Sequence, residues 1–223
     1  MPGTSQEDGG SIGYRARVPP DTTPSLATPP PRFRRIAVYC GSNLGRRPEY
    51  SAAATDLGAF LADAGIGVVF GGGRVGLMGA LANGALARGG EVIGVIPEKL
   101  RDLELAHTGV TELHVVDGMH PRKTKMADLS DAFIAMPGGF GTLEELFEVT
   151  TWAQLNYHLK PVGLLNVEGY YDKLLAFIEH GADEGFIRPI HRDLIVSATT
   201  ASELLERLAA AEVPDIGRWI EER

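Results

Sequence analysis

Short apolar runs alternate with longer amphipathic stretches from Arg35 almost to the end of the sequence. The runs are rich in β-branched and apolar residues, as buried strands are; they read RIAVYC, GVVFG, EVIGVI, ELHVV, DAFIAM, PVGLLNV and DLIVSA. Most are separated by segments of helical length, including PEYSAAATDLGAFLADAG, VGLMGALANGALARGG, TLEELFEVTTWAQLNYH and YYDKLLAFIEHGADEG. Strands that alternate with helices pair in parallel through right-handed crossovers. The alternation therefore predicts an α/β fold: a doubly wound, mainly parallel sheet with helices on both faces.

Residues 1–32 differ in composition from the rest of the sequence. They are rich in Pro, Gly, Ser and Thr, and they show no sustained periodicity. Such a segment buries too little apolar surface to offset the entropy lost on ordering, so we expect a disordered N-terminal arm. Nothing near the middle of the remaining sequence resembles a linker. Residues 33–223 are therefore predicted to form a single domain.

The formal net charge of −8 limits the possible partners. Nucleic acids and anionic membranes both require a broad basic surface, so neither is expected as a partner, whereas a small phosphorylated molecule could still bind in a local basic pocket. The single cysteine, Cys40, cannot form an intrachain disulfide, and no apolar run has the length of a signal-peptide core or a membrane span. We expect a cytoplasmic location. The six histidines lack metal-ligand spacing, so no metal site is predicted.

Three segments that follow predicted strands carry the candidate chemistry, because ligands of doubly wound sheets bind beyond the carboxyl ends of the strands. The first is GGGRVGLMG, in which Gly71, Gly73 and Gly76 fit the pattern G-x-G-x-x-G. Such glycines let the backbone approach a phosphate and aim helix amides at it, or they simply permit a tight strand-to-helix turn. Glu98 follows at the distance expected of a ribose-binding acid in a dinucleotide site. A nicotinamide-dependent oxidoreductase is therefore one alternative.

The second segment is PGGFGTLEE, residues 137–145. Pro137 ends the preceding strand, and Gly138, Gly139 and Gly141 form a cradle without side chains. Thr142 is predicted to begin a helix whose amides and dipole could hold a phosphate. A purely structural alternative is a capping box, in which Glu145 bonds back to the backbone of Thr142.

The third segment is GMHPRKTKM, residues 118–126. It concentrates Arg122, Lys123 and Lys125 at the end of a predicted strand in an otherwise acidic protein. Such a cluster usually forms a solvated helix face. If the three segments converge, however, the arginine could clamp a carboxylate or phosphate through paired hydrogen bonds.

The segment from Met119 to Tyr171 resembles the LOG family, the cytokinin riboside 5′-monophosphate phosphoribohydrolases, whose members were often labelled lysine decarboxylases. The hallmarks are the Arg122-Lys123 pair and P-G-G-x-G-T-x-x-E, here Pro137 through Glu145. The CGS motif at residues 40–42 and the GGG-x-x-GLMG loop match as well. The resemblance implies a Rossmann-like fold, a dimer or larger assembly, and no required redox cofactor.

The resemblance also implies an activity: hydrolysis of an N6-substituted adenosine 5′-monophosphate to free base and ribose 5-phosphate. It places Arg122 and Glu145 at the catalytic positions and Glu98 at the base end of the pocket. Glu145 would stabilise positive charge on the sugar or activate water, while Arg122 would orient Glu145 or contact the phosphate end. The residues assigned to substrate binding are Ser42, Gly72, Gly73, Glu98, Met119, Lys123, Gly138, Gly139, Gly141 and Thr142.

Several alternatives remain open from the sequence. The substrate could be plain AMP, or the chain could be a nucleotide-binding or carrier module without catalysis. Retention of both Arg122 and Glu145 favours catalysis, because a binder needs only the glycine cradles. The helix that follows Thr142 has apolar residues around more than one face, which predicts a homodimer.

Overall fold

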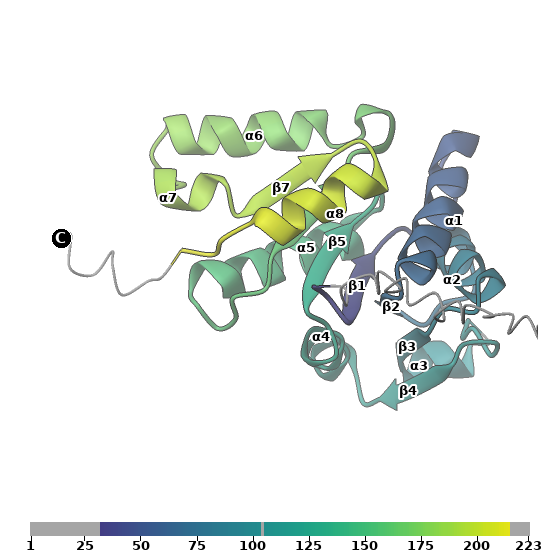
Figure 1. The fold of residues 1–223 in the computed structure, drawn as a ribbon. Coiled ribbons are helices and arrows are strands. Elements are labelled where there is room, and N and C mark those ends of the chain that lie inside the picture. The colour runs from purple at the N-terminus through teal and green to yellow at the C-terminus, as the bar shows by residue number, and fades with distance from the viewer. Residues whose placement is uncertain (1–31, 104, 215–223) are drawn as a thin grey trace, which may run out of the picture. The chain divides into compact units, whose positions relative to one another are not determined.

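The computed structural model describes residues 32–103 and 105–214, and they form one parallel sheet flanked by helices (Figure 1). All seven strands predicted from the apolar runs are present, and every pairing within the sheet is parallel. The strands are β1 (Arg35–Tyr39), β2 (Gly67–Phe70), β3 (Val92–Pro97), β4 (Glu112–Val116), β5 (Ala132–Ala135), β6 (Val162–Leu165) and β7 (Ile195–Ala198). Their spatial order is β4-β3-β2-β1-β5-β6-β7.

This strand order creates one topological switch point. The chain winds outward from β1 to β4 and then returns to the other side of β1, where β5 pairs with it. The connections that leave β1 and β5 therefore diverge to opposite faces of the sheet. In doubly wound folds such a divergence opens a crevice at the carboxyl ends of the two strands.

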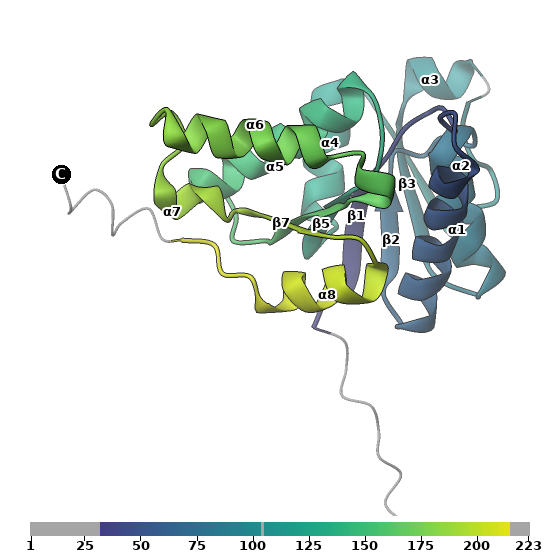
Figure 2. The same ribbon diagram turned by 90° about the horizontal axis from the view of Figure 1, so that it is seen from above.

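Helices cover both faces of the sheet, as the sequence predicted (Figure 2). The helices are α1 (Pro48–Asp63), α2 (Gly76–Ala87), α3 (Glu98–Asp102), α4 (Met119–Asp128), α5 (Phe140–Gln154), α6 (Asp172–Asp183), α7 (Pro189–Arg192) and α8 (Ala201–Ala210), with a short 3₁₀ turn, η1 (Val167–Gly169). Successive β1 residues point to opposite faces: Ile36 packs in the core shared with α1, α2 and α8, whereas Ala37 packs in the core shared with α4, α5 and α6.

The predicted N-terminal arm falls on residues 1–31, outside the described residues, apart from Arg32. The extent of a single domain over residues 33–223 stays a prediction for the same reason at the C-terminal end. None of the helices in the described ranges is both long enough and apolar enough to cross a membrane.

Candidate active site

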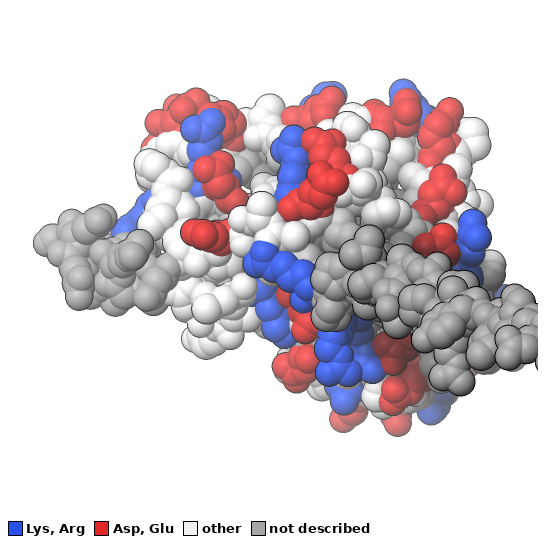
Figure 3. Space-filling view, in the orientation of Figure 1, with Lys and Arg blue, Asp and Glu red and all other residues white. Residues whose placement is uncertain are grey.

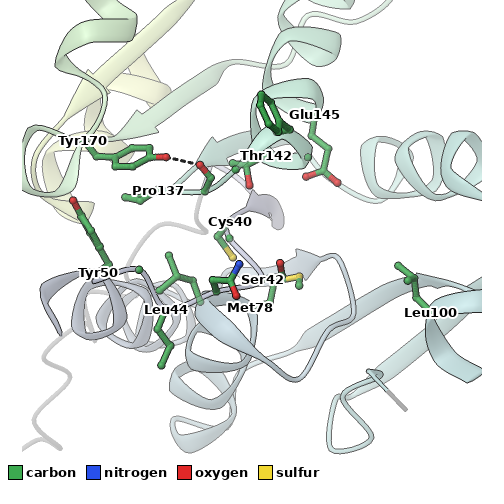
Figure 4. A pocket seen from close by; sticks show the side chains of 18 of the residues that line it. Cys40, Ser42, Leu44, Tyr50, Met78, Leu100, Pro137, Thr142, Glu145 and Tyr170 are labelled. Atoms are coloured by element: carbon green, nitrogen blue, oxygen red, sulfur yellow. Dashed lines mark hydrogen bonds between the residues drawn. The ribbon is translucent and has the colours of Figure 1, made fainter. Parts of the chain in front are cut away.

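A cavity of about 440 Å³ lies at the switch point between β1 and β5 (Figure 4). One wall is the segment that follows β1, from Cys40 to Gly45, together with residues of α1 and α2. The opposite wall is the segment that follows β5, from Pro137 to Thr142, together with Glu145. Arg122 of α4 and Tyr170 also line the cavity. The fold thus brings Ser42, Arg122, Thr142, Glu145 and the three cradle glycines to one place.

Backbone hydrogen bonds hold the converging segments together. The amide of Gly41 donates to the carbonyl of Pro137 at 3.0 Å, and the amide of Leu77 donates to the carbonyl of Gly41 at 3.0 Å. Gly76 has a φ of +64°, and a Cβ built on it would lie 2.2 Å from the carbonyl carbon of Ser42. Glycine is therefore required where α2 meets the segment that follows β1.

The floor of the cavity contains a buried ion pair. Nη1 of Arg122 donates to Oε1 of Glu145 at 2.6 Å, and Nε of Arg122 donates to the carbonyl of Val95 at 3.1 Å. Arg122 is 8% exposed and Glu145 is 6% exposed. A Cβ at Gly71 would lie 2.1 Å from Nη2 of Arg122, so this glycine makes room for the guanidinium. Of the two alternatives for the basic cluster, the solvated helix face is wrong for Arg122 and Lys123, because both side chains are buried.

Burial controls the protonation of Glu145. It raises the pKa of the Glu145 carboxyl because the charged form loses solvation, and the adjacent Arg122 guanidinium opposes that rise. A carboxylate with a raised pKa that is held beside a cation can balance positive charge and accept a proton more readily than an ordinary glutamate. Burial also raises the pKa of the Cys40 thiol, so Cys40 stays a neutral wall residue.

The start of α5 forms the cradle predicted from the glycines. Gly139 is the N-cap residue, and the first bond to its carbonyl comes from the amide of Leu143, at 3.1 Å. The amides of Phe140, Gly141 and Thr142 therefore have no acceptor within the helix and point out of its positive end. A Cβ at Gly139 or Gly141 would meet no atom within 4 Å, so packing does not explain these two glycines.

The predicted capping box is wrong. The helix begins at Phe140, two positions before the predicted start, and Thr142 lies inside its first turn. Glu145 is then too far along the helix to reach back to the N-cap amide, and it bonds to Arg122 instead. Thr142 can occupy this position only because residue 138 is a glycine. A Cβ at Gly138 would lie 2.1 Å from the Thr142 Oγ1.

Five residues assigned to substrate binding lie outside the lining of the cavity: Gly72, Gly73, Glu98, Met119 and Lys123. Gly72 has a φ of +73° and packs on β3, and Gly73 packs against the side chain of Met78. Glu98 and Met119 are exposed at the starts of α3 and α4. Their contacts with a substrate stay predictions.

Lys123 lies beside the cavity floor but faces α5. Its ammonium group donates to the carboxylates of Glu144 and Glu148. Burial lowers the pKa of Lys123, and these two hydrogen bonds more than offset the effect, so its net pKa is raised. A charge bound by two carboxylates of the same helix fixes α4 against α5 and so supports the Arg122–Glu145 pair.

Aromatic and apolar side chains at the cavity rim were not predicted from the sequence. Tyr50 of α1 and Tyr170 meet edge to face with ring centroids 5.9 Å apart, and Phe140 is 93% exposed. Leu44, Met78 and Leu100 also line the cavity. These residues belong to no glycine or charge motif, and only the folded topology brings them together. In the described ranges, no group of three or more His, Cys, Asp or Glu side chains could hold a metal ion.

Comparison with known proteins places the chain in a family. The family model described as "Possible lysine decarboxylase" matches residues 78–208. The cytokinin riboside 5′-monophosphate phosphoribohydrolase LOG3 of Arabidopsis thaliana is 54% identical over 177 residues, which is 79% of this chain and 82% of that protein. The protein named LOG from Oryza sativa subsp. japonica is also 54% identical over 177 residues, 79% of this chain and 73% of its own length.

Solved structures show the same fold at greater distance. A molybdenum cofactor carrier protein from Chlamydomonas reinhardtii aligns with a TM-score of 0.60 and 24% identity, over 79% of this chain and 98% of that chain. A molybdenum cofactor binding protein from Rippkaea orientalis gives 0.60 and 24%, over 79% and 95%. These identities support a shared Rossmann-like fold and nothing about ligands. The relatives at 54% identity are decisive, and this chain belongs to the LOG family, whose curated members are named cytokinin riboside 5′-monophosphate phosphoribohydrolases.

Proposed function

We propose that this protein hydrolyses the N-glycosidic bond of N6-substituted adenosine 5′-monophosphates, releasing the free base and ribose 5-phosphate. One observation carries the proposal: a buried Glu145–Arg122 pair shares a cavity with the open glycine start of α5. The first supplies a carboxylate for bond cleavage and the second supplies a phosphate site. The relatives at 54% identity are named phosphoribohydrolases of a riboside 5′-monophosphate, a reaction that needs both a bond-cleaving group and a phosphate site.

Glu145 acts at the sugar. As the base leaves C1′ with the electron pair of the glycosidic bond, positive charge builds on the ribose ring. A carboxylate beside that carbon stabilises the charge and accepts a proton from the water that bonds to C1′. The base takes up a proton as it departs. Because Arg122 does not readily release a proton, its role is to hold Glu145 oriented and ionised.

The phosphate binds at the start of α5. The unpaired amides of Phe140, Gly141 and Thr142 point out of the positive end of the helix, and the Thr142 hydroxyl adds a further donor. Gly139 and Gly141 leave open space where a side chain would block an oxyanion. The base then extends toward the rim, where Leu100 of α3 lies two positions beyond Glu98. We keep Glu98 as the proposed contact at the base end, with Ser42, Gly72, Gly73, Met119 and Lys123 as the other proposed contacts.

The test is an assay of base release. Purified protein is incubated with N6-isopentenyladenosine 5′-monophosphate, with AMP and with the unphosphorylated riboside, and free base is followed by chromatography. Release from the monophosphates alone supports the proposal, and the ratio of their rates gives the base preference. Tight nucleotide binding without any release would instead favour a binding or carrier module.

We also propose that the chain forms a homodimer through the outer surface of α5. Leu146, Val149 and Ala153 of this helix are buried in its own domain, whereas Phe147 is 41% exposed. Near the C-terminal end of α5, Leu155, Tyr157 and Leu159 are also exposed. Figure 3 shows a largely uncharged area there, while acidic and basic side chains are interspersed over the rest of that face. Sedimentation as a monomer at micromolar concentration would contradict the proposal.

The proposed location is the cytoplasm. The only cysteine of the sequence, Cys40, is buried at the end of β1, so folding gains nothing from an oxidising compartment. Fractionation of the native host cells tests this location directly.

A further inference from the structure

Two adjacent tyrosines hold the segment that joins β5 to α5. The hydroxyl of Tyr171 donates to the carbonyl of Met136 at 2.6 Å, and the hydroxyl of Tyr170 donates to the carbonyl of Gly138 at 2.5 Å (Figure 4). The carbonyl between them, that of Pro137, accepts from the amide of Gly41. Three consecutive carbonyls are therefore each bound by a donor from another part of the chain.

A tight turn places both tyrosines for these bonds. Glu168 and Gly169 have φ values of +54° and +67°, which reverse the chain after β6. The side-chain oxygen of Asn166 accepts from the amide of Tyr171 at 2.7 Å, and its nitrogen donates to Asp172 at 2.7 Å. The Asn166 side chain is buried and bonded through both its oxygen and its nitrogen, so it fixes the turn that carries the two tyrosine hydroxyls.

The two tyrosines differ in their surroundings. Tyr171 is fully buried in the core beneath the sheet end, and its bond to Met136 fixes the end of β5. Tyr170 is 42% exposed, lines the cavity and contacts the rings of Tyr50 and Tyr171 edge to face. Tyr171 therefore fixes the end of β5, whereas the Tyr170 hydroxyl holds the first glycine of the cradle, Gly138.

The peptide held by Tyr170 leads directly into the proposed phosphate site, because its second residue, Gly139, is the N-cap residue of α5. A trans peptide is planar, with its carbonyl and amide on opposite sides, so fixing the Gly138 carbonyl also fixes the direction of the Gly139 amide. Glycines flank this peptide on both sides and leave its dihedral angles free. At Gly139 no neighbouring atom lies where a side chain would pack. The hydroxyl of Tyr170 therefore restrains the orientation of a peptide whose two glycines impose little preference on it.

We propose that Tyr170 is a positioning residue: its hydroxyl sets the orientation of the Gly138–Gly139 peptide and thereby pre-forms the phosphate site at the start of α5. This inference rests on the phosphate site of the proposed function. Tyr170 acts through the peptide and makes no bond to the reacting atoms. Its loss weakens binding of the phosphate end and leaves the chemical step at Glu145 intact, because Glu145 is held separately by Arg122.

The test compares Tyr170→Phe with the wild-type protein. The substitution removes only the hydroxyl and keeps the ring that packs on Tyr50. Ser202→Ala is the control for loss of a single hydroxyl, because Ser202 is exposed on α8 and lies outside the cavity and outside the proposed dimer surface. Three quantities are measured: the affinity for ribose 5-phosphate by calorimetry, KM and kcat for N6-isopentenyladenosine 5′-monophosphate, and the affinity for the unphosphorylated riboside.

In Tyr170→Phe, the dissociation constant of ribose 5-phosphate and the KM for the monophosphate should both rise by about five- to tenfold, the loss of one hydrogen bond. The kcat should stay within about twofold, and the affinity for the riboside should not change. Ser202→Ala should match the wild type in every measurement. A structural role alone would lower the affinities for the riboside and the monophosphate together.

Two results would overturn the inference. One is an unchanged affinity of folded Tyr170→Phe for ribose 5-phosphate, and the other is a wild-type protein that binds no phosphorylated ligand at all. If the wild type binds ribose 5-phosphate but releases no base, the proposed hydrolysis fails. In that case the positioning role is supported if Tyr170→Phe weakens the binding of ribose 5-phosphate and contradicted if it does not.

Discussion

Replacing Gly71 by alanine tests whether the position of Arg122 controls the activity. The added Cβ would lie 2.1 Å from Nη2 of Arg122, about 1.3 Å inside the 3.4 Å at which ordinary contact begins, and 3.1 Å from the sulfur of Met78. Met78 can swing away, but the guanidinium is held by Glu145 and by the carbonyl of Val95. It must move by more than about 1 Å, which breaks one of these bonds.

A displacement of about 1 Å at a catalytic group lowers turnover by about a hundredfold. Gly71→Ala should therefore reduce kcat for base release by roughly that factor. Gly109→Ala serves as the control, because Gly109 is not part of the cavity lining and an added Cβ there would meet only the half-buried ring of His107. Thermal unfolding of both variants separates an effect on the site from a loss of folded protein.

A double-mutant cycle isolates the cause. If Gly71→Ala acts through the guanidinium, adding it to Arg122→Ala should lower kcat no further, because the displaced group is already gone. Additive losses would show that the alanine disturbs α2 or the substrate directly. Either that result or a wild-type kcat in Gly71→Ala alone would refute the reasoning.

Three further outcomes follow from the same site. Glu145→Gln should lower kcat by at least about a hundredfold without loss of nucleotide affinity, which base-release kinetics and calorimetry report; near-normal turnover would remove Glu145 from the mechanism. The active form of Glu145 is the carboxylate and burial raises its pKa, so kcat should fall on the acid side at a higher pH than for an ordinary glutamate. Arg122→Met should move that fall to still higher pH, as a pH–kcat profile would show, because Arg122 opposes the rise. Thr142→Val should reduce the preference for the monophosphate over the riboside by about fivefold in competition assays, the loss of one hydrogen bond.

The sequence predicted the sheet because local pattern controls strand formation. Each apolar run is short and bounded by helical segments, and all seven became parallel strands. The convergence of Arg122 and Glu145 could be expected from the family resemblance but not from the residues themselves. The two lie 23 positions apart on different helices, and their contact depends on β3, which supplies the carbonyl of Val95.

Other features depend on contacts that no local pattern encodes. The predicted capping box failed because α5 begins at Phe140, with Gly139 as its N-cap residue, and Glu145 bonds to Arg122 of α4 instead. The sequence suggested that Lys123 is a surface cation. In the structure its side chain is buried, and its ammonium group bonds to Glu144 and Glu148 of α5. The role proposed for Tyr170 could not be predicted from the sequence. Its hydroxyl reaches the carbonyl of Gly138 only because the fold brings the turn after β6 next to the turn after β5.

The two glycine segments have different physical explanations, although both fit phosphate-binding patterns. In the segment after β2, Gly71 makes room for the Arg122 guanidinium and Gly76 makes room for the backbone of Ser42, so packing alone accounts for them. In the segment after β5, Gly139 and Gly141 border empty space, and packing accounts for neither. A side chain at Gly71 would disturb catalysis from within the protein, whereas one at Gly141 would block the ligand. These contacts support our proposal that the phosphate binds at the segment after β5, and in the segment after β2 Gly71 acts indirectly by leaving room for the Arg122 guanidinium.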